Sequence, residues 1–192
     1  MSDLRVVLAV TGASGAPLAV RAAQRLAAFP ELELHLVMSN AAKRTLAHEC
    51  GAQAATALVE SAHQVHAIDD IGASIASGSF RSRAMLVVPC SMRTLAAIAG
   101  GISDNLIVRA ADVHLKERRR LVLVTRETPL HLGHIRNMAA VTEMGAIVMP
   151  PAPAFYALPQ SVEDIVDHLA ARAIDLLDLG LPPQARQWLG QG

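Results

Sequence analysis

Two short loops of small and hydroxyl-bearing residues are the parts of this chain best suited to hold an anion. Residues 11–15 (TGASG) follow one apolar run, and residues 91–94 (SMRT) follow another. Small side chains let the backbone approach a ligand, and a helix that begins there offers free N–H groups to a phosphate. An ordinary tight turn and a simple helix N-cap are the alternatives. Because both loops follow parallel strands of one predicted sheet, we favour phosphate binding.

The kind of nucleotide is narrowed by what these loops lack. The first loop is not a GxGxxG sequence, and the second apolar run ends in Met38-Ser39-Asn40 without an acidic residue. An acidic side chain at that place would bind the ribose of a dinucleotide. Its absence argues against NAD and for a mononucleotide.

Basic residues elsewhere supply charge that a second anion would need. Arg109, Asp112 and Lys116 share one stripe of a predicted helix, because their spacings are three and four residues. A solvated ladder of ion pairs is the alternative. Arg126 and Glu127 directly follow a predicted strand, where surface charge is the alternative but the position favours function.

Arg172 lies in the last predicted helix and is expected near the centre of an apolar arc. That arc consists of Ile165, Leu169, Ala173 and Leu176. A buried guanidinium without a partner would cost several kcal/mol, on the order of what an isolated buried charge costs. Arg172 should therefore bind a ligand, or else pair with Asp175 or Glu127.

Aromatic residues are few and lie mostly outside the predicted elements. Phe80, Phe155, Tyr156 and Trp188 are placed in loops or in the tail. Since packing is the usual role of an aromatic side chain, this placement favours a planar or apolar ligand.

No set of residues has the spacing of a metal site. The pairs His63/His66 and His131/His134 each lack a third ligand, and Cys50 and Cys90 form no CxxC pair. The sequence therefore predicts a protein without a metal.

The elements that must position these loops alternate between short apolar strands and longer helices. The predicted strands are 5–10, 32–38, 84–88, 121–124 and 146–149, and the predicted helices are 17–29, 41–50, 92–99, 104–118, 132–144 and 162–179. Strands this apolar indicate a parallel sheet covered on both faces. We predict one α/β domain over residues 1–180, doubly wound and flavodoxin-like or Rossmann-like, followed by a tail over 181–192. Ligands bind such sheets at the carboxyl ends of the strands.

Composition excludes several classes of partner. The chain has 192 residues, is 52% hydrophobic and 18% charged, and carries 17 basic against 17 acidic residues. A formal net charge of zero gives no field that attracts nucleic acid. No uninterrupted apolar run approaches about 18 residues, and no signal peptide is recognised, so we expect a cytoplasmic protein without a membrane partner.

Six motifs in order give the chain a resemblance to a known family. They are TGASG, SGS at 77–79, PCSMRTLA, DNLIVRAADVHLKE, RETPL and PPAPAFY. Together they resemble the UbiX family of flavin prenyltransferases over about residues 5–180, and the branch once named phenylacrylic acid decarboxylases is the nearest in kind. Members bind FMN and join a dimethylallyl group from dimethylallyl phosphate to N5 and C6 of the reduced flavin. The product serves UbiD-type decarboxylases, and the members are homo-oligomers, commonly dodecamers, whose sites draw residues from neighbouring subunits.

The resemblance implies a role for each matching residue. The flavin would be held by Gly12, Ala13, Ser14, Ser39, Ser91, Met92, Arg93, Thr94 and Arg126. The prenyl phosphate would be bound by Tyr156, Arg172, Lys116 and Trp188, and the catalytic set would be Glu49, Lys116, Glu127, Ser14 and Arg109. Either Glu49 or Glu127 would take the proton. Thr125 departs from the family, since some members have proline there.

The reaction expected from these residues needs no metal. Prenyltransferases that bind a diphosphate do so through Mg²⁺ and clustered aspartates, whereas Asp69-Asp70 is the one aspartate pair in this chain. Two alternatives stay open: a flavin-dependent decarboxylase of the phosphopantothenoylcysteine kind, and a non-catalytic subunit that delivers flavin to an aromatic acid decarboxylase.

Overall fold

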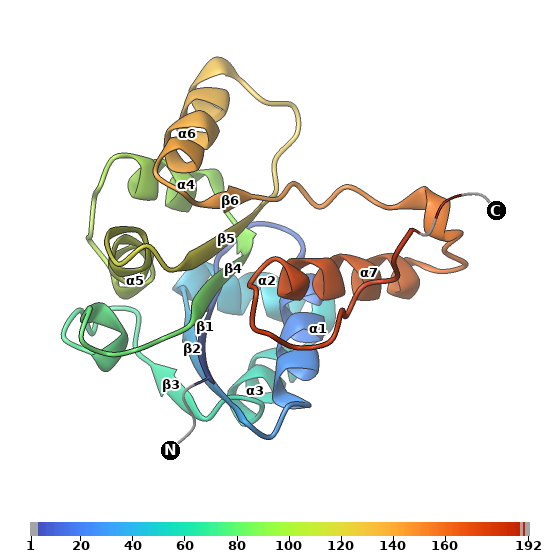
Figure 1. Ribbon diagram of the computed structural model, residues 1–192, viewed down its shortest axis with the longest axis horizontal. Helices are drawn as coiled ribbons and strands as arrows, with labels where there is room; N and C mark the ends of the chain where they lie inside the picture. Colours follow the sequence, from blue (N-terminus) through green and yellow to red (C-terminus); the bar gives the residue numbers. More distant parts are fainter. Residues whose placement is uncertain (1–3, 189, 191–192) are drawn as a thin grey trace.

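A six-stranded parallel sheet forms the centre of the computed structural model, which describes residues 4–188 and 190 (Figure 1). The strand order is β3-β2-β1-β4-β5-β6. The strands are β1 (Leu4–Val10), β2 (Leu32–Met38), β3 (Gln64–His66), β4 (Ala84–Cys90), β5 (Arg120–Thr125) and β6 (Ile147–Val148). This is the order of a doubly wound sheet, so the predicted fold class is confirmed.

Helices cover both faces of the sheet, as the apolar strands predicted. They are α1 (Ala16–Ala27), α2 (Asn40–Cys50), α3 (Ala54–Glu60), α4 (Met92–Ala99), α5 (Leu106–Lys116), α6 (Leu132–Glu143) and α7 (Val162–Asp175), with 3₁₀ turns η1 (Ser74–Ala76) and η2 (Phe155–Ala157). Side chains alternate along each strand: Val6 and Leu8 pack in the core under α1 and α7, whereas Val7 and Ala9 pack in the core under α4 and α5. Both faces are therefore dry.

The order reverses between β1 and β4, which places the two anion-loop candidates next to each other. Buried Thr11 ties them together, because its hydroxyl donates to the Pro89 carbonyl at 2.7 Å and accepts from the Ser91 N–H at 2.9 Å. Ligands of doubly wound sheets bind at such a reversal. The sequence did not identify Thr11 as the link between the loops.

Two predictions about the elements are corrected. The sequence predicts neither a helix nor a strand between residues 51 and 82, but α3 lies there and β3 pairs with β2 there. It has three residues and is largely exposed, so it lacks the apolar run used to recognise the other strands. The last helix ends at Asp175 instead of 179, and the chain then runs back alongside α7 toward η2 (Figure 1).

Ion pairs fix α7 against the first helix. Asp167 of α7 pairs with Arg21 at 2.5 Å and with Arg25 at 2.6 Å, both from α1. The hydrogen bond from Arg25, the largest influence, and the contact with Arg21 hold the pKa of the Asp167 carboxyl below its usual value, although partial burial acts in the opposite direction.

No helix in the described part of the chain is long and apolar enough to cross a membrane. The domain boundary at residue 180 stays a prediction.

Candidate functional site

The amino end of α1 is occupied by a carboxylate from α2. Gly15, with φ of +114°, adopts the left-handed conformation that glycine tolerates and turns its N–H toward Glu49. Oε2 of Glu49 accepts from the N–H groups of Gly15 and Ala16 at 2.9 and 2.8 Å. The first loop therefore does carry anion-binding N–H groups, and two of them are bound to a side chain of the same protein.

This contact settles the charge on Glu49. Partial burial opposes ionisation, but hydrogen bonds from Ser14, Gly15 and Ala16, with the nearby charge of Arg126, hold the pKa below its ordinary value. Glu49 is therefore anionic near neutral pH and is a weak proton acceptor there. Ser14 is exposed beside it, and Gly12 and Ala13 complete the loop.

The hydroxyls predicted to hold a flavin serve as helix caps. Ser39 caps α2 by accepting from the N–H of Ala42 at 3.0 Å. Ser91 caps α4 through Thr94, as the alternative for this loop proposed. Met92 and Arg93 lie in the same first turn, and Arg93 forms an ion pair with Asp104. A cap still leaves hydroxyl lone pairs and neighbouring N–H groups for a ligand.

Three consecutive residues stand at the carboxyl end of β5. The Arg126 N–H donates to the Cys90 carbonyl at 3.3 Å, which keeps Arg126 beside the second loop. Glu127 is exposed and accepts from the N–H of Thr128 at 3.0 Å. Thr125 is 2% exposed, yet its hydroxyl has no partner within the described chain. A buried hydroxyl without a partner at this edge is a place where a bound group would supply one.

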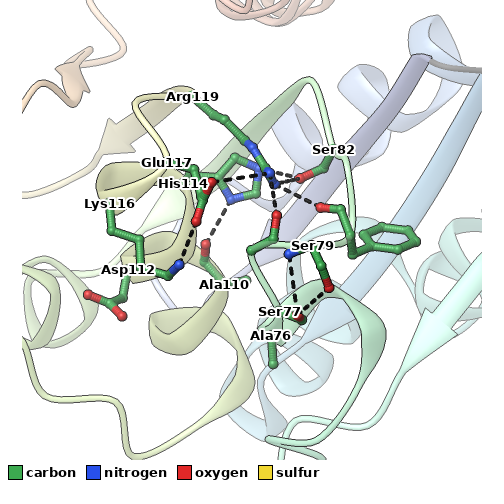
Figure 2. Close-up of polar contacts among 12 residues, drawn as sticks. Ala76, Ser77, Ser79, Ser82, Ala110, Asp112, His114, Lys116, Glu117 and Arg119 are labelled. Atoms are coloured by element: carbon green, nitrogen blue, oxygen red, sulfur yellow. Dashed lines mark hydrogen bonds and ion pairs between the residues drawn. The ribbon is translucent and has the colours of Figure 1, made fainter.

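A second group of predicted residues lies on α5. Arg109 pairs with Asp112 at 2.9 Å, so part of the expected ladder is present. Lys116 pairs instead with Glu117 at 2.6 Å (Figure 2). Gly78 faces this pair so closely that an added Cβ would lie 2.3 Å from the Glu117 carboxylate and 2.7 Å from Lys116 Nζ. A larger residue at position 78 would therefore have to displace the Lys116–Glu117 ion pair.

The loop that contains Gly78 is held by two residues that the sequence did not single out. Fully buried His114 joins Ala110 of its own helix, at 2.7 Å, to the Ser82 hydroxyl at 2.9 Å (Figure 2). Arg119 donates to the Gly78 carbonyl at 2.6 Å and to the Phe80 carbonyl at 2.8 Å. Burial lowers the pKa of His114 to about 4, so the imidazole is neutral at neutral pH.

The third group corrects the prediction for Arg172. Its side chain is exposed, and the buried face of α7 consists instead of Leu169, Ala170, Ala171, Ala173 and Ile174. The predicted arc was rotated too far around the helix. Arg172 nevertheless meets its expected neighbours, because it lines a cavity of about 590 Å³ with Tyr156 and Trp188. Asp175, expected as a possible partner of Arg172, accepts backbone N–H groups of the tail instead.

The three groups lie apart within one chain. Lys116 precedes β5 and Arg126 follows it, so the six residues of that strand, about 20 Å, separate them. Tyr156 belongs to η2, which lies beyond the amino end of α7 and away from the sheet (Figure 1). Across residues 4–188, no hydrogen bond or ion pair connects one group to another.

The described residues contain no group of three or more His, Cys, Asp or Glu side chains placed to hold a metal ion. The rings of His131 and His134 contact each other in a tilted arrangement, with centroids 3.6 Å apart, and His35 stacks on His66 at 5.3 Å.

Comparison with known proteins gives consistent matches. The family model described as Flavoprotein matches residues 1–174. Flavin prenyltransferase UbiX of Neisseria meningitidis serogroup B is 50% identical over 186 residues, which is 97% of this chain and 97% of the relative. The solved structure of a dodecameric FMN-dependent UbiX-like decarboxylase from Escherichia coli O157:H7 superposes with a TM-score of 0.92 at 48% identity, covering 97% of this chain and all of that one. AnUbiX (PadA1), solved in complex with FMN and dimethylallyl pyrophosphate, gives 0.86 at 46% identity, covering 98% and 99%.

Proposed function

We propose a function from the family of this chain, which belongs to the UbiX flavin prenyltransferases within the Flavoprotein family. The protein transfers a dimethylallyl group from dimethylallyl phosphate to N5 and C6 of reduced FMN. The observation that carries the proposal is the reversal between β1 and β4, where hydroxyl and basic side chains follow four parallel strands. The two alternatives, a cysteinyl decarboxylase and a passive flavin carrier, are not favoured, since the Neisseria meningitidis relative that is 50% identical over 97% of this chain is named a flavin prenyltransferase.

The carboxyl edge of the sheet fits FMN. Ser39 and Ser91 present hydroxyls at the first turns of two helices, and Arg126 adds a guanidinium. The buried Thr125 hydroxyl, which has no partner within the described residues, could form a hydrogen bond with the bound cofactor. In this role Gly12, Ala13 and Ser14 would let the cofactor approach the first loop. When bound, reduced FMN supplies the electron-rich ring atoms that the allylic carbon joins.

The basic residues would stabilise the phosphate that leaves. Breaking an allylic C–O bond places negative charge on phosphate oxygens, and preorganised cations favour that charge over the neutral bridging oxygen of the ester. Arg109, Lys116 and Arg172 supply the cations, and the Tyr156 hydroxyl supplies a neutral donor. Arg109 and Lys116 are already oriented by Asp112 and Glu117, so little ordering remains when the ester binds.

Glu127 is the better placed of the two carboxylates to take the proton lost from the ring. Its side chain is exposed at the carboxyl edge, and within the described residues the Thr128 N–H is its one hydrogen-bond donor. Glu49, in contrast, accepts from the amino end of α1 and has a lowered pKa. A carboxylate with a lowered pKa accepts protons less readily. Glu49 would instead hold Ser14 and Arg126 in place.

A complete site would need more than one copy of the chain. The α5 group, the edge group and the group beside η2 are separate in one copy, and association would bring a different copy's group to each edge. The dodecameric relative supports this arrangement. Two further proposals follow from the family: a UbiD-type decarboxylase receives the product, tested by restoring its activity with the reaction mixture, and the protein is cytoplasmic, tested by cell fractionation.

An anaerobic mass measurement tests the function. Purified protein, reduced FMN and dimethylallyl phosphate without added metal should give a flavin heavier by one five-carbon unit. A parallel reaction with the diphosphate decides the preferred ester, because a relative was solved with dimethylallyl pyrophosphate. An unchanged flavin mass with both esters would refute the proposal.

A further inference from the structure

The tail after α7 is fastened to that helix by one carboxylate. Asp175 is the last residue of α7, and its Oδ1 accepts from the Gln184 N–H at 2.7 Å. Its Oδ2 accepts from the Ala185 N–H at 3.0 Å. Two consecutive backbone donors therefore bind the two oxygens of one side chain, which is a strong and directional arrangement.

Two arginines hold the tail on either side of this point. Arg25 of α1 donates to the Gln184 side chain at 3.3 Å, and Arg186 donates to the Ala157 carbonyl of η2 at 3.0 Å. The tail therefore crosses α7 along a fixed path and reaches η2, as its course in Figure 1 shows.

The end of this path holds the tyrosine proposed to bind phosphate. Trp188 meets the Tyr156 ring edge-on, with centroids 5.5 Å apart and an interplanar angle of 71°. His168, one turn before Arg172 on α7, meets the same ring at 6.3 Å and 89°. Tyr156 is thus contacted from two sides in the cavity that Arg172 lines. Without the tail, the ring of this half-exposed residue would lose one of those contacts.

We infer that Asp175 is a positioning residue, whose grip on the tail sets Trp188 against Tyr156 and so orders the Tyr156–Arg172 subsite for a phosphate ester. The inference rests on the proposed function for the identity of the ester. The tail N–H groups also cover a carboxylate that would otherwise repel an anion in this cavity.

Asp175→Asn is the test, with Asp178→Asn as the matched control. Asparagine keeps the shape and can still accept from one tail N–H, but its NH₂ group faces the other tail donor, so one of the two hydrogen bonds and the negative charge are lost. Asp178 is close by and exposed, and its carboxylate contacts Arg120 at 3.4 Å without touching the tail N–H groups. The control therefore reports the effect of removing one negative charge from the same region. Ala185→Pro is a second variant that removes one donor and leaves Asp175 intact.

Two measurements are made on the full-length proteins. Trp188 is the single tryptophan of the chain, so acrylamide quenching of its emission reports the position of the tail directly. Calorimetry then gives the Kd of dimethylallyl phosphate on protein loaded with oxidised FMN, and separately the Kd of FMN. We expect stronger quenching and about a tenfold weaker ester affinity in Asp175→Asn and Ala185→Pro, with FMN affinity unchanged. Asp178→Asn should match the wild type or bind the ester more tightly.

Two results from the tail variants would overturn the inference. Unchanged quenching in both tail variants would show that Asp175 does not hold the tail. Stronger quenching with unchanged ester affinity would show that the tail does not order the subsite. If the wild-type protein binds the ester but leaves the flavin unmodified, the proposed reaction is refuted and the inference about Asp175 stands. If the wild-type protein binds no ester, both the proposed reaction and the inference are refuted.

Discussion

Replacing Glu49 by glutamine should destabilise the protein by removing the charge at the amino end of α1. Glutamine can still accept one of the two N–H groups, so the loss is the charge-assisted part of the contact. A hydrogen bond to a charged group contributes about 1.5–3 kcal/mol when shielded. Because Glu49 is partly exposed, solvent screening reduces the expected loss to about 1–2 kcal/mol. For a chain of this size that lowers the Tm by about 2–8 °C.

The effect should vanish in acid. The folded-state pKa of Glu49 lies below its ordinary value of 4.5, so its carboxylate stabilises the folded protein above that pH. The stabilisation is lost as the pH falls through the folded pKa. Thermal unfolding of wild type and variant, followed by circular dichroism from pH 7 downward, should therefore show two Tm values that converge below pH 4.5.

Glu60→Gln is the control, since Glu60 is exposed at the end of α3 and its carboxylate forms no hydrogen bond or ion pair within residues 4–188. It should leave the Tm unchanged at every pH. Equal Tm values for Glu49→Gln and wild type at pH 7, or a difference that persists undiminished in strong acid, would refute the assignment of Glu49 as an ionised cap.

Three further outcomes are expected. Burial lowers the pKa of His114 from 6.5 to about 4, so between these pH values the unfolded chain binds more protons and the wild-type protein should lose stability as the pH is lowered. The free energy of unfolding, measured by urea titration at several pH values, should depend less steeply on pH in His114→Gln. An equal slope in wild type and variant would contradict this. Thr11→Val should cost about 2 kcal/mol and weaken FMN binding, measured by calorimetry, because it removes the buried hydroxyl between the two loops; unchanged affinity would show that the loops stay aligned without it. Glu127→Gln and Lys116→Ala should abolish turnover in the flavin mass assay yet retain FMN, and loss of FMN itself would mean that their roles are misassigned.

The central strands were accessible from sequence because burial on both faces leaves an unbroken apolar run. Residues 5–10, 32–38 and 84–88 all lie in strands, and the loops that follow them meet at the carboxyl edge as expected. A parallel sheet forces this, since carboxyl ends of its strands share one side. β3 escaped because its short, exposed strand has the composition of a loop.

The details of the candidate site depended on contacts between distant residues. Glu49 lies 34 positions from Gly15, and no local pattern shows that its carboxylate reaches that N–H. The arc around Arg172 was misjudged because alanine fits either side of a helix, so the alanines of α7 did not fix which face is buried. From sequence alone Asp175 has Arg172, three residues away, as its nearest candidate partner, whereas the N–H groups that it accepts from belong to the tail, after the helix has ended.

The two outermost strands of the sheet are its shortest, with three residues in β3 and two in β6. An open sheet can be extended by any extended chain that finds free backbone groups along its margin, and that is a common route to uncontrolled aggregation. Margins this brief offer such a chain very few groups to pair with. Copies of this protein should therefore associate through the side chains of their helices and loops. The sheet of one subunit should not form backbone hydrogen bonds with the sheet of another.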